Sequence, residues 1–179
     1  VIKDKRIKAV TLTGSKPAGA AVASTAGSEI KKSVLELGGS NALVVFENAD
    51  LESALDTCIQ ARFQNTGQSC IAGKRLLLQE NIAEEFTKKY VEKVKELKSG
   101  DPMHKDTFIG TMARADLAED LEKQIRASVD AGAKILIGGE RDGAYMQPTV
   151  LDGVTKEMAI FKEETFGPAI GITRFKTAE

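Results

Sequence analysis

The sequence predicts an α/β fold, with an open and largely parallel sheet and flanking helices. Two observations support this expectation. Short β-branched and apolar runs alternate with longer amphipathic segments, and no internal repeat or low-complexity linker interrupts them. Of the 179 residues, 42% are hydrophobic and 28% are charged, a composition typical of a globular protein with one full domain, or one domain and part of a second.

The first predicted elements are a strand and a helix. Residues 6–13 (RIKAVTLT) predict a buried strand, which Gly14 ends. The alanine-rich residues 16–29 predict a helix, with Ser15 as its N-cap and Pro17 tolerated in the first turn. Further strands are predicted over residues 42–46, 75–79, 134–137, 148–151 and 169–175.

Three amphipathic helices are predicted between the later strands, because apolar residues recur at helical spacing. Asn81 and Glu84 resemble a capping box at the start of the second helix, and Gly132 ends the third. The three apolar faces are Leu51, Ala54, Leu55, Cys58 and Ile59; Ile82, Phe86, Tyr90, Val94 and Leu97; and Leu117, Leu121, Ile125 and Val129.

The charge balance argues against several classes of partner. There are 25 Lys and Arg against 26 Asp and Glu, so the formal net charge is -1 and favours neither nucleic acid nor an anionic membrane. No apolar run approaches the roughly 20 residues that span a bilayer. The first residues do not resemble a signal peptide, and we therefore expect a cytoplasmic protein.

Cysteine and histidine usage limits the possible sites. Two cysteines, Cys58 and Cys70, argue against a disulfide scaffold or a four-ligand zinc site, so we expect reduced thiols and no metal. The one histidine, His104, lies in Asp-Pro-Met-His-Lys, a sequence that predicts a solvated surface turn. A general base in this chain is therefore expected to be a carboxylate.

Cys70 is the candidate nucleophile. It lies in Asn-Thr-Gly-Gln-Ser-Cys, on a predicted connection between a helix and a strand, where scaffolds present reactive groups. Gly67 permits an unusual backbone angle there, and N–H groups near Ser69 and Cys70 are placed to face a developing oxyanion. A loop thiol without a catalytic role remains an alternative, whereas Cys58 lies on an apolar helix face and is interpreted as a core residue.

Glu36 is the candidate general base. It stands in Val-Leu-Glu-Leu-Gly-Gly, between Leu35 and Leu37 and ahead of two glycines, which is unusual for a solvated surface. A carboxylate in apolar surroundings suits a general base. An exposed glutamate at a strand end is an equally open interpretation of the same residues.

Two further motifs are candidates for cofactor binding. Thr13, Gly14 and Ser15 join a strand to a helix N-terminus, whose free N–H groups and dipole favour phosphate. The Glu-Glu-Thr-Phe-Gly-Pro motif at 163–168 offers carboxylates for ribose hydroxyls, and Phe166 for a nicotinamide ring. Taken alone, each motif is also compatible with an ordinary turn.

In this order, T-G-S, E-L-G-G, G-Q-S-C and E-E-x-F-G-P resemble the aldehyde dehydrogenase superfamily, NAD(P)-dependent enzymes. The resemblance covers essentially the whole chain, including Lys-Ser-Gly-Asp-Pro at 98–102 and Tyr-Met-Gln-Pro-Thr at 145–149. The stretches around Glu36, Cys70 and Lys74 look most like the bacterial succinate-semialdehyde dehydrogenase branch. The resemblance also implies an aldehyde dehydrogenase catalytic-domain fold.

The resemblance implies a role for each matched residue. Cys70 matches the catalytic nucleophile and Glu36 the general base. The cofactor-contacting positions, for NAD or NADP, are matched by Thr13, Gly14, Ser15, Leu37, Gly38, Glu164 and Phe166.

The implied reaction is oxidation of a small aldehyde, such as succinate semialdehyde, to the acid. The Cys70 thiolate attacks the aldehyde, hydride passes to the nicotinamide, and water activated by Glu36 hydrolyses the resulting thioester. The partners implied are the aldehyde substrate and, in the full-length enzyme, further copies of the same chain. Neither NAD nor NADP is favoured, because the residue that discriminates them lies upstream of Val1 in the family.

The resemblance implies two domains. Residues 1–36 match the last strand and helix of a dinucleotide-binding domain, and residues 37–179 match the catalytic domain, truncated at its C-terminus. We therefore expect a fragment of a larger enzyme, without the family's upstream oxyanion-hole asparagine and with a sheet edge open to a partner. Ser40 also departs from the basic residue or Asn of many members. Two alternatives follow: residual cysteine-dependent esterase activity, or an assembly role without dehydrogenase activity.

Overall fold

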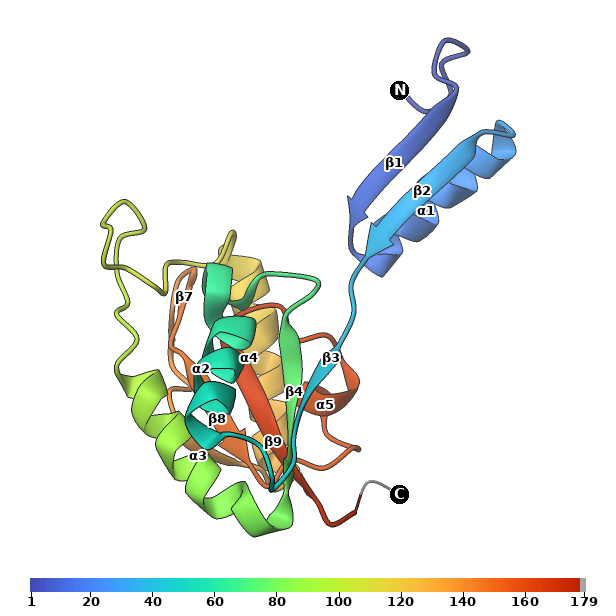
Figure 1. Ribbon diagram of the computed structural model, residues 1–179. Helices are drawn as coiled ribbons and strands as arrows, with labels where there is room; N and C mark the ends of the chain where they lie inside the picture. Colours follow the sequence, from blue (N-terminus) through green and yellow to red (C-terminus); the bar gives the residue numbers. More distant parts are fainter. Residues whose placement is uncertain (178–179) are drawn as a thin grey trace. The chain divides into compact units, whose positions relative to one another are not determined.

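The computed structural model describes residues 1–177, and the chain divides into two compact units (Figure 1). The first is Val1–Gly39 and the second is Ser40–Glu179. In the described part of the chain, no helix is both long enough and apolar enough to cross a membrane.

The first unit is a strand–helix–strand motif. Its strands β1 (Ala9–Gly14) and β2 (Lys32–Leu37) pair in parallel, and α1 (Lys16–Ser28) connects them. Ser15 caps α1 as predicted, since its hydroxyl accepts a hydrogen bond from the N–H of Ala18 at 3.4 Å. Gly19 lets α1 approach β2 closely, because an added Cβ would lie 2.6 Å from the Leu37 side chain.

The prediction of a buried strand over residues 6–13 is wrong in two respects. The strand begins at Ala9, and its burial pattern alternates between exposed and half-buried residues. The physical reason is that this sheet has only two strands and one covering helix, so its other face has no layer of this unit against it. Alternation of burial is typical of a strand that is covered on one face.

The second unit contains a five-stranded sheet of order β3-β4-β9-β8-β5. The predicted α/β class with a largely parallel sheet is confirmed, because within this sheet the β3–β4, β4–β9 and β8–β9 pairs are parallel and the β5–β8 pair is antiparallel. The predicted strand bounds at 134–137 and 169–175 are confirmed, and the other strands begin or end within two residues of the predictions. The strands are β3 (Asn41–Val45), β4 (Gly73–Gln79), β5 (Lys134–Ile137), β8 (Thr149–Asp152) and β9 (Ala169–Phe175).

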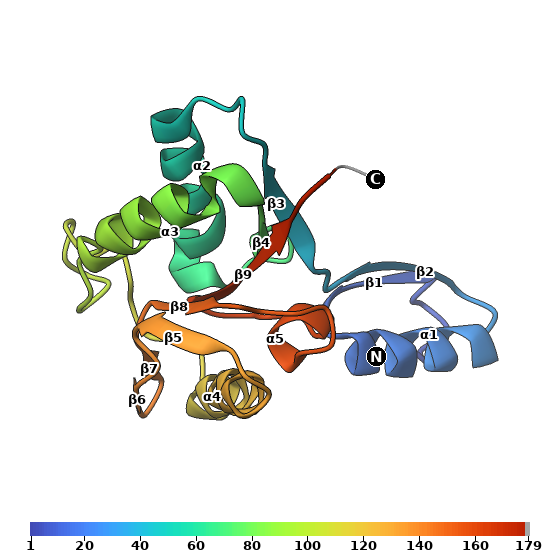
Figure 2. The ribbon, with the colours of Figure 1, turned by 90° about the horizontal axis from the view of Figure 1, so that it is seen from below.

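Helices cover both faces of this sheet (Figure 2). On one face lie α2 (Leu51–Phe63) and α3 (Glu80–Lys95), and on the other α4 (Ala115–Asp130) and the short α5 (Ala159–Lys162). Each pair closes its own core against the sheet. The predicted apolar faces supply both cores, through Leu55, Cys58, Ile59, Phe86, Tyr90 and Val94 in one and Leu121 and Ile125 in the other.

The predicted capping box at Asn81 is wrong. Helix α3 begins at Glu80, directly after β4, so Gln79 occupies the N-cap position and Asn81 already lies in the first turn. The Asn81 amide instead donates to the Glu47 carboxylate at 2.6 Å. A strand that runs straight into a helix leaves no residues for a separate cap.

Several elements were not among the predicted ones, including β2 and the short α5. A two-stranded hairpin joins β6 (Arg141–Asp142) to β7 (Tyr145–Met146), and the 3-10 turn η1 (Gln64–Gly67) follows α2. The turn is unusual because Asn65, Thr66 and Gly67 have φ values of 54°, 56° and 70°. A left-handed run of this kind needs tertiary contacts to hold it, since non-glycine residues there are strained.

Candidate active site

The predicted site residues fall into two groups, one in each unit. In the first unit, the strand register pairs Thr13 with Glu36 and Gly14 with Leu37. The T-G-S and E-L-G-G motifs, which are distant in the sequence, therefore meet at the carboxyl ends of β1 and β2. Ser15 then opens α1 at the same edge of this small sheet.

Glu36 lies on the exposed face of β2. Because side chains alternate along a strand, Leu35 and Leu37 point to the half-buried face while Glu36 points away from it. Within this unit, Glu36 is therefore an exposed carboxylate near the end of the strand. The flanking leucines do not enclose it.

Cys70 lies in the connection between α2 and β4, and its side chain is exposed. Contacts made by the preceding residues hold this connection in place. The Asn65 amide donates to the carbonyl of Gln68 at 3.0 Å, and the Gln68 amide oxygen accepts from the N–H of Ala113 at 2.9 Å. The buried Thr66 hydroxyl accepts from the N–H of Gly110 at 3.1 Å. The left-handed turn thus has the tertiary contacts that its strain requires.

Lys74 ties the Cys70 connection to the Glu-Glu-Thr-Phe-Gly-Pro loop. Its ammonium donates to the carbonyl of Cys70 at 3.0 Å and to a carboxylate oxygen of Glu164 at 2.6 Å. It also lies 5.7 Å from the centre of the Phe166 ring. The Lys74 side chain is 0% exposed and that of Glu164 is 30% exposed. The structure therefore brings together three of the predicted site residues around a buried lysine.

Arg62 forms a second connection between the same loops. Its guanidinium is fully buried and donates to the carbonyls of Gly67 at 3.3 Å, Gly73 at 3.3 Å and Thr165 at 3.0 Å, and also to that of Gly167. Burial lowers the pKa of Arg62 to about 10, while Tyr90 and Glu164 oppose that shift. Four main-chain carbonyls thus converge on one side chain.

Sequence reasoning missed both Lys74 and Arg62. A signal for Arg62 was present, because Leu55, Cys58, Ile59 and Arg62 follow one another at i, i+3, i+4 and i+7 on the buried face of α2. A charge that continues an apolar helical face predicts a buried cation with specific acceptors. No equivalent signal marked Lys74.

The two cysteines differ in accessibility and chemistry. Cys58 is 3% exposed within the core, as predicted, and burial raises the pKa of its thiol from 9.0 to about 11. Cys70 is exposed. The prediction that Cys58 is a core residue is therefore confirmed.

This difference predicts selective thiol labelling. At about pH 8 the raised pKa keeps folded Cys58 protonated, and its burial excludes reagent, so iodoacetamide should alkylate Cys70 alone. We expect one equivalent per chain in native buffer and two in urea, with peptide mass spectrometry locating each adduct. Alkylation of Cys58 at a comparable native rate would contradict this.

Gly67 is the residue whose substitution should most directly disturb the Cys70 turn. An added Cβ would meet the Gly167 carbonyl oxygen at 2.4 Å and the Arg62 guanidinium at 2.8 Å. We expect Gly67→Ala to destabilise the second unit by about 2–3 kcal/mol, from strain and a clash together. The matched control is Gly143→Ala, also at positive φ but with open space around its Cβ, which should cost about 1 kcal/mol. Equal losses in urea unfolding would contradict the proposed clash.

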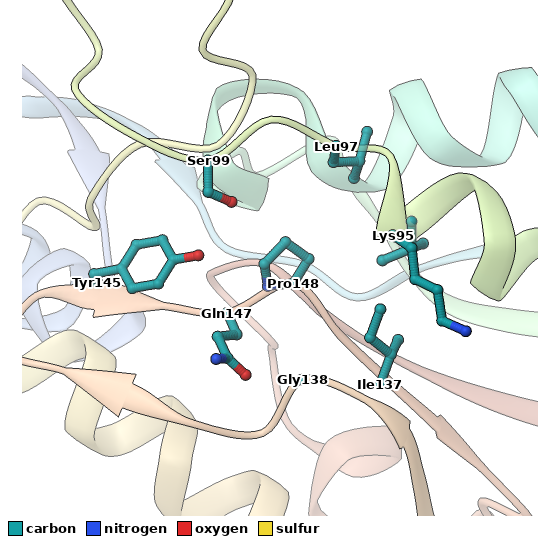
Figure 3. Close-up of a pocket in the computed structure, with 9 residues that line it drawn as sticks. Lys95, Leu97, Ser99, Ile137, Gly138, Tyr145, Gln147 and Pro148 are labelled. Carbon is teal, nitrogen blue, oxygen red and sulfur yellow. The ribbon is translucent and has the colours of Figure 1, made fainter.

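A separate cavity of about 280 Å³ lies away from these residues (Figure 3). It is formed where the end of α3 faces the segments after β5 and β7, and none of the predicted site residues lines it. Its lining consists of Val94, Lys95, Leu97, Ser99, Ile137, Gly138, Tyr145, Gln147 and Pro148. His104 is exposed, as its turn sequence predicts, and residues 1–177 contain no cluster of three His, Cys, Asp or Glu side chains that would hold a metal ion.

Comparisons with known proteins agree on one family. The family model described as the aldehyde dehydrogenase family matches residues 1–179. The chain is 48% identical to a succinate semialdehyde dehydrogenase (NAD(P)+) of Escherichia coli K12, with 100% of the chain and 39% of that protein covered. It is 44% identical to a succinate-semialdehyde dehydrogenase (NADP(+)) of Mycobacterium leprae, with 96% and 38% covered. The chain thus spans less than two-fifths of the length of these relatives.

Solved structures show the same likeness. An NAD-dependent aldehyde dehydrogenase from Sinorhizobium meliloti superposes with a TM-score of 0.95 at 38% identity, with 99% of the chain and 36% of that structure covered. A succinate-semialdehyde dehydrogenase from Burkholderia pseudomallei gives a TM-score of 0.94 at 30% identity, with 98% and 37% covered.

Proposed function

The chain belongs to the aldehyde dehydrogenase family, and from that premise we propose that it carries the nucleophile of an NAD(P)-dependent oxidation of an aldehyde to a carboxylic acid. One observation supports this most strongly. Cys70 is exposed, and its main-chain carbonyl accepts a hydrogen bond from Lys74, whose ammonium also donates to the partly exposed carboxylate of Glu164.

The residues present fit a nicotinamide cofactor. In the first unit, Thr13, Gly14 and Ser15 lead into the N-terminus of a 13-residue helix, which favours phosphate. In the second unit, the Glu164 carboxylate can accept from ribose hydroxyls, and the Phe166 ring is 39% exposed. Leu37 and Gly38 follow at the end of β2 and complete the proposed cofactor contacts. NAD and NADP are both compatible with these groups.

The mechanism assigns separate tasks to Cys70 and Glu36. The Cys70 thiolate attacks the aldehyde carbon and forms a thiohemiacetal, whose oxyanion is stabilised by N–H donors near the sulfur. When bound, the nicotinamide supplies the oxidant that converts this adduct to a thioester. Glu36 takes a proton from water as that water attacks the thioester, which releases the acid and restores the thiol.

The substrate we propose is a small aldehyde, with succinate semialdehyde as the first candidate. Both curated relatives described above are succinate-semialdehyde dehydrogenases, at 48% and 44% identity. We further propose that residues 1–36 belong to a dinucleotide-binding domain and residues 37–179 to a catalytic domain. The observed division, between Gly39 and Ser40, lies close to that boundary.

Assembly of the whole enzyme into a homo-oligomer is also proposed. Its support is apolar exposure at both edge strands of the five-stranded sheet. Val44 on β3 is 48% exposed, and Ile135 and Leu136 on β5 are 42% and 38% exposed. Apolar side chains on unpaired edges favour coverage by another chain.

The test is turnover of succinate semialdehyde with NAD and then with NADP, followed by the fluorescence of the reduced nicotinamide. The control is the same protein after alkylation of Cys70 with iodoacetamide. Turnover that alkylation abolishes would support the proposal. No turnover, with Cys70 still rapidly alkylated, would instead favour a chain that keeps the nucleophile without dehydrogenase activity, and ester hydrolysis would then be measured.

Replacing the proposed base should separate the two halves of the reaction. In the form of the protein that turns over aldehyde, we expect Glu36→Gln to lower steady-state turnover by about 100-fold, because water is no longer activated. One equivalent of reduced nicotinamide per Cys70 should still appear as a burst. Rapid-mixing fluorescence measures both phases. A variant that loses the burst and the steady state equally would exclude a deacylation role for Glu36.

A further inference from the structure

We propose that Lys74 is a positioning residue that couples the carboxylate of Glu164 to the main chain of Cys70. The inference rests on the proposed function only in taking Cys70 as the nucleophile and Glu164 as a carboxylate that binds the cofactor. Its geometric basis is independent, because one ammonium lies 3.0 Å from the Cys70 carbonyl oxygen and 2.6 Å from a Glu164 carboxylate oxygen.

The burial of Lys74 supports this role. Its side chain is 0% exposed, at a strand start whose neighbours Ala72 and Leu76 are buried and apolar. An ammonium is costly to remove from water, and an apolar residue of similar size often stabilises a buried position better. A charge at this position is therefore explained by what it contacts and not by packing alone.

The two partners of the ion pair differ in exposure. Lys74 is fully buried, whereas Glu164 retains 30% of its side-chain exposure. The ion pair thus connects the buried ammonium of Lys74 to a carboxylate that a ligand in solution can reach. A change at that carboxylate, such as hydrogen bonding to a ribose hydroxyl, alters the electrostatic interaction between Glu164 and the Lys74 ammonium. Because the same ammonium donates to the Cys70 carbonyl, the change reaches the residue that carries the thiol.

The loops that carry Cys70 and Glu164 lead into two neighbouring strands of the sheet. Strands β4 and β9 are adjacent and parallel, with Arg75 paired to Gly171, so the loops that precede them start from fixed positions at one edge of the sheet. Lys74 spans these loops on the Cys70 side and lies beside the Phe166 ring. Because the strands fix the ends of both loops and the Lys74–Glu164 ion pair connects them, a local change in one loop is transmitted to the other.

The experiment is a double-mutant cycle read out by the alkylation rate of Cys70 with iodoacetamide. We expect Glu164→Gln to change this rate by about threefold or more when Lys74 is present, and to have almost no effect in the Lys74→Met background. Lys74→Arg, which keeps a cation with several donors, should preserve most of the coupling. A purely structural lysine would give equal effects of Glu164→Gln in both backgrounds, and that result would overturn the proposal.

Two controls keep the cycle interpretable. Lys98→Met removes an exposed ion pair with Asp106 in the same unit and should leave the alkylation rate unchanged. Where Lys74→Met fails to give the native far-UV circular dichroism spectrum, Lys74→Gln replaces it, because glutamine can donate to the Cys70 carbonyl but carries no charge for Glu164. The same expected and contradicting outcomes apply to that variant.

This readout is separable from the proposed dehydrogenase activity. Alkylation of Cys70 needs neither aldehyde nor nicotinamide. Full turnover in a Cys70→Ala variant would reject the proposed function and leave the cycle standing. An additive cycle would reject the coupling through Lys74 and leave the proposed function standing.

Discussion

Replacing Cys70 by alanine is expected to lower aldehyde oxidation by at least about 10⁴-fold, because no other described side chain in its loop offers an equivalent nucleophile. The fold should be unaffected, since the side chain is exposed and makes no core contact. The measurement is the rate of nicotinamide reduction at saturating aldehyde, made on the form of the protein that oxidises aldehyde. Far-UV circular dichroism and urea unfolding should match the parent protein.

The matched control for this variant is Cys58→Ala. That change removes a buried thiol from the core and should cost about 1 kcal/mol of stability through a small cavity, with turnover per folded molecule retained. Turnover that survives in Cys70→Ala but is lost in Cys58→Ala would contradict the assignment of the nucleophile. Loss in both, with native folding in both, would point to a role for each thiol.

Replacing Arg62 by leucine is expected to destabilise the second unit by about 4 kcal/mol or more. The reason is the number of carbonyls that lose the guanidinium as a donor, namely those of Gly67, Gly73 and Thr165, and that of Gly167, which keeps the N–H of Ala169 at 2.8 Å. An unsatisfied buried acceptor costs about 1–3 kcal/mol, and water can reach only some of them after relaxation. Leucine restores the packing volume only in part.

Alkylation of Cys58 provides the measurement, because this buried thiol reports unfolding of the second unit alone. Its rate as a function of urea gives the free energy of unfolding of each variant. The control is Arg126→Leu on α4, where the guanidinium is 73% exposed and pairs with Glu122, and the expected change is below about 1 kcal/mol. Similar losses for the two arginines would show that the buried carbonyls find other donors.

Much of the fold was predictable because local patterns and tertiary structure agree. The strand at 169–175 and the helix that carries Leu121 and Ile125 were located by periodicity, and both lie where expected. The start of α3 was wrong because a capping signal does not reveal that a strand continues into the helix. The short hairpin at Tyr145 was missed because two-residue strands have no period to detect.

For the candidate site, the identity of the residues was predictable from the sequence, but the contacts that position them were not. Motif order identified Cys70, Glu36, Glu164 and the T-G-S turn as candidates, but it gave no information on what holds them. The contacts of Lys74 and Arg62 join residues about 90 and 105 positions apart in sequence, as Lys74–Glu164 and Arg62–Gly167. Such contacts depend on the adjacency of β4 and β9, which a single sequence does not reveal. The catalytic roles themselves stay predictions until the variants are measured.

The adjacency of β4 and β9 has a consequence for dividing the molecule into two polypeptides. The chain leaves β4, passes through the exposed segment at 98–106 and returns to β9 beside it. A backbone break within that segment would leave Cys70 and Lys74 on one piece and Glu164 on the other. Neither piece alone would contain the Lys74–Glu164 ion pair, and reassociation would restore it. Fused to two proteins that bind each other, the pieces would act as a complementation reporter, with a change in the rate of Cys70 alkylation as its signal.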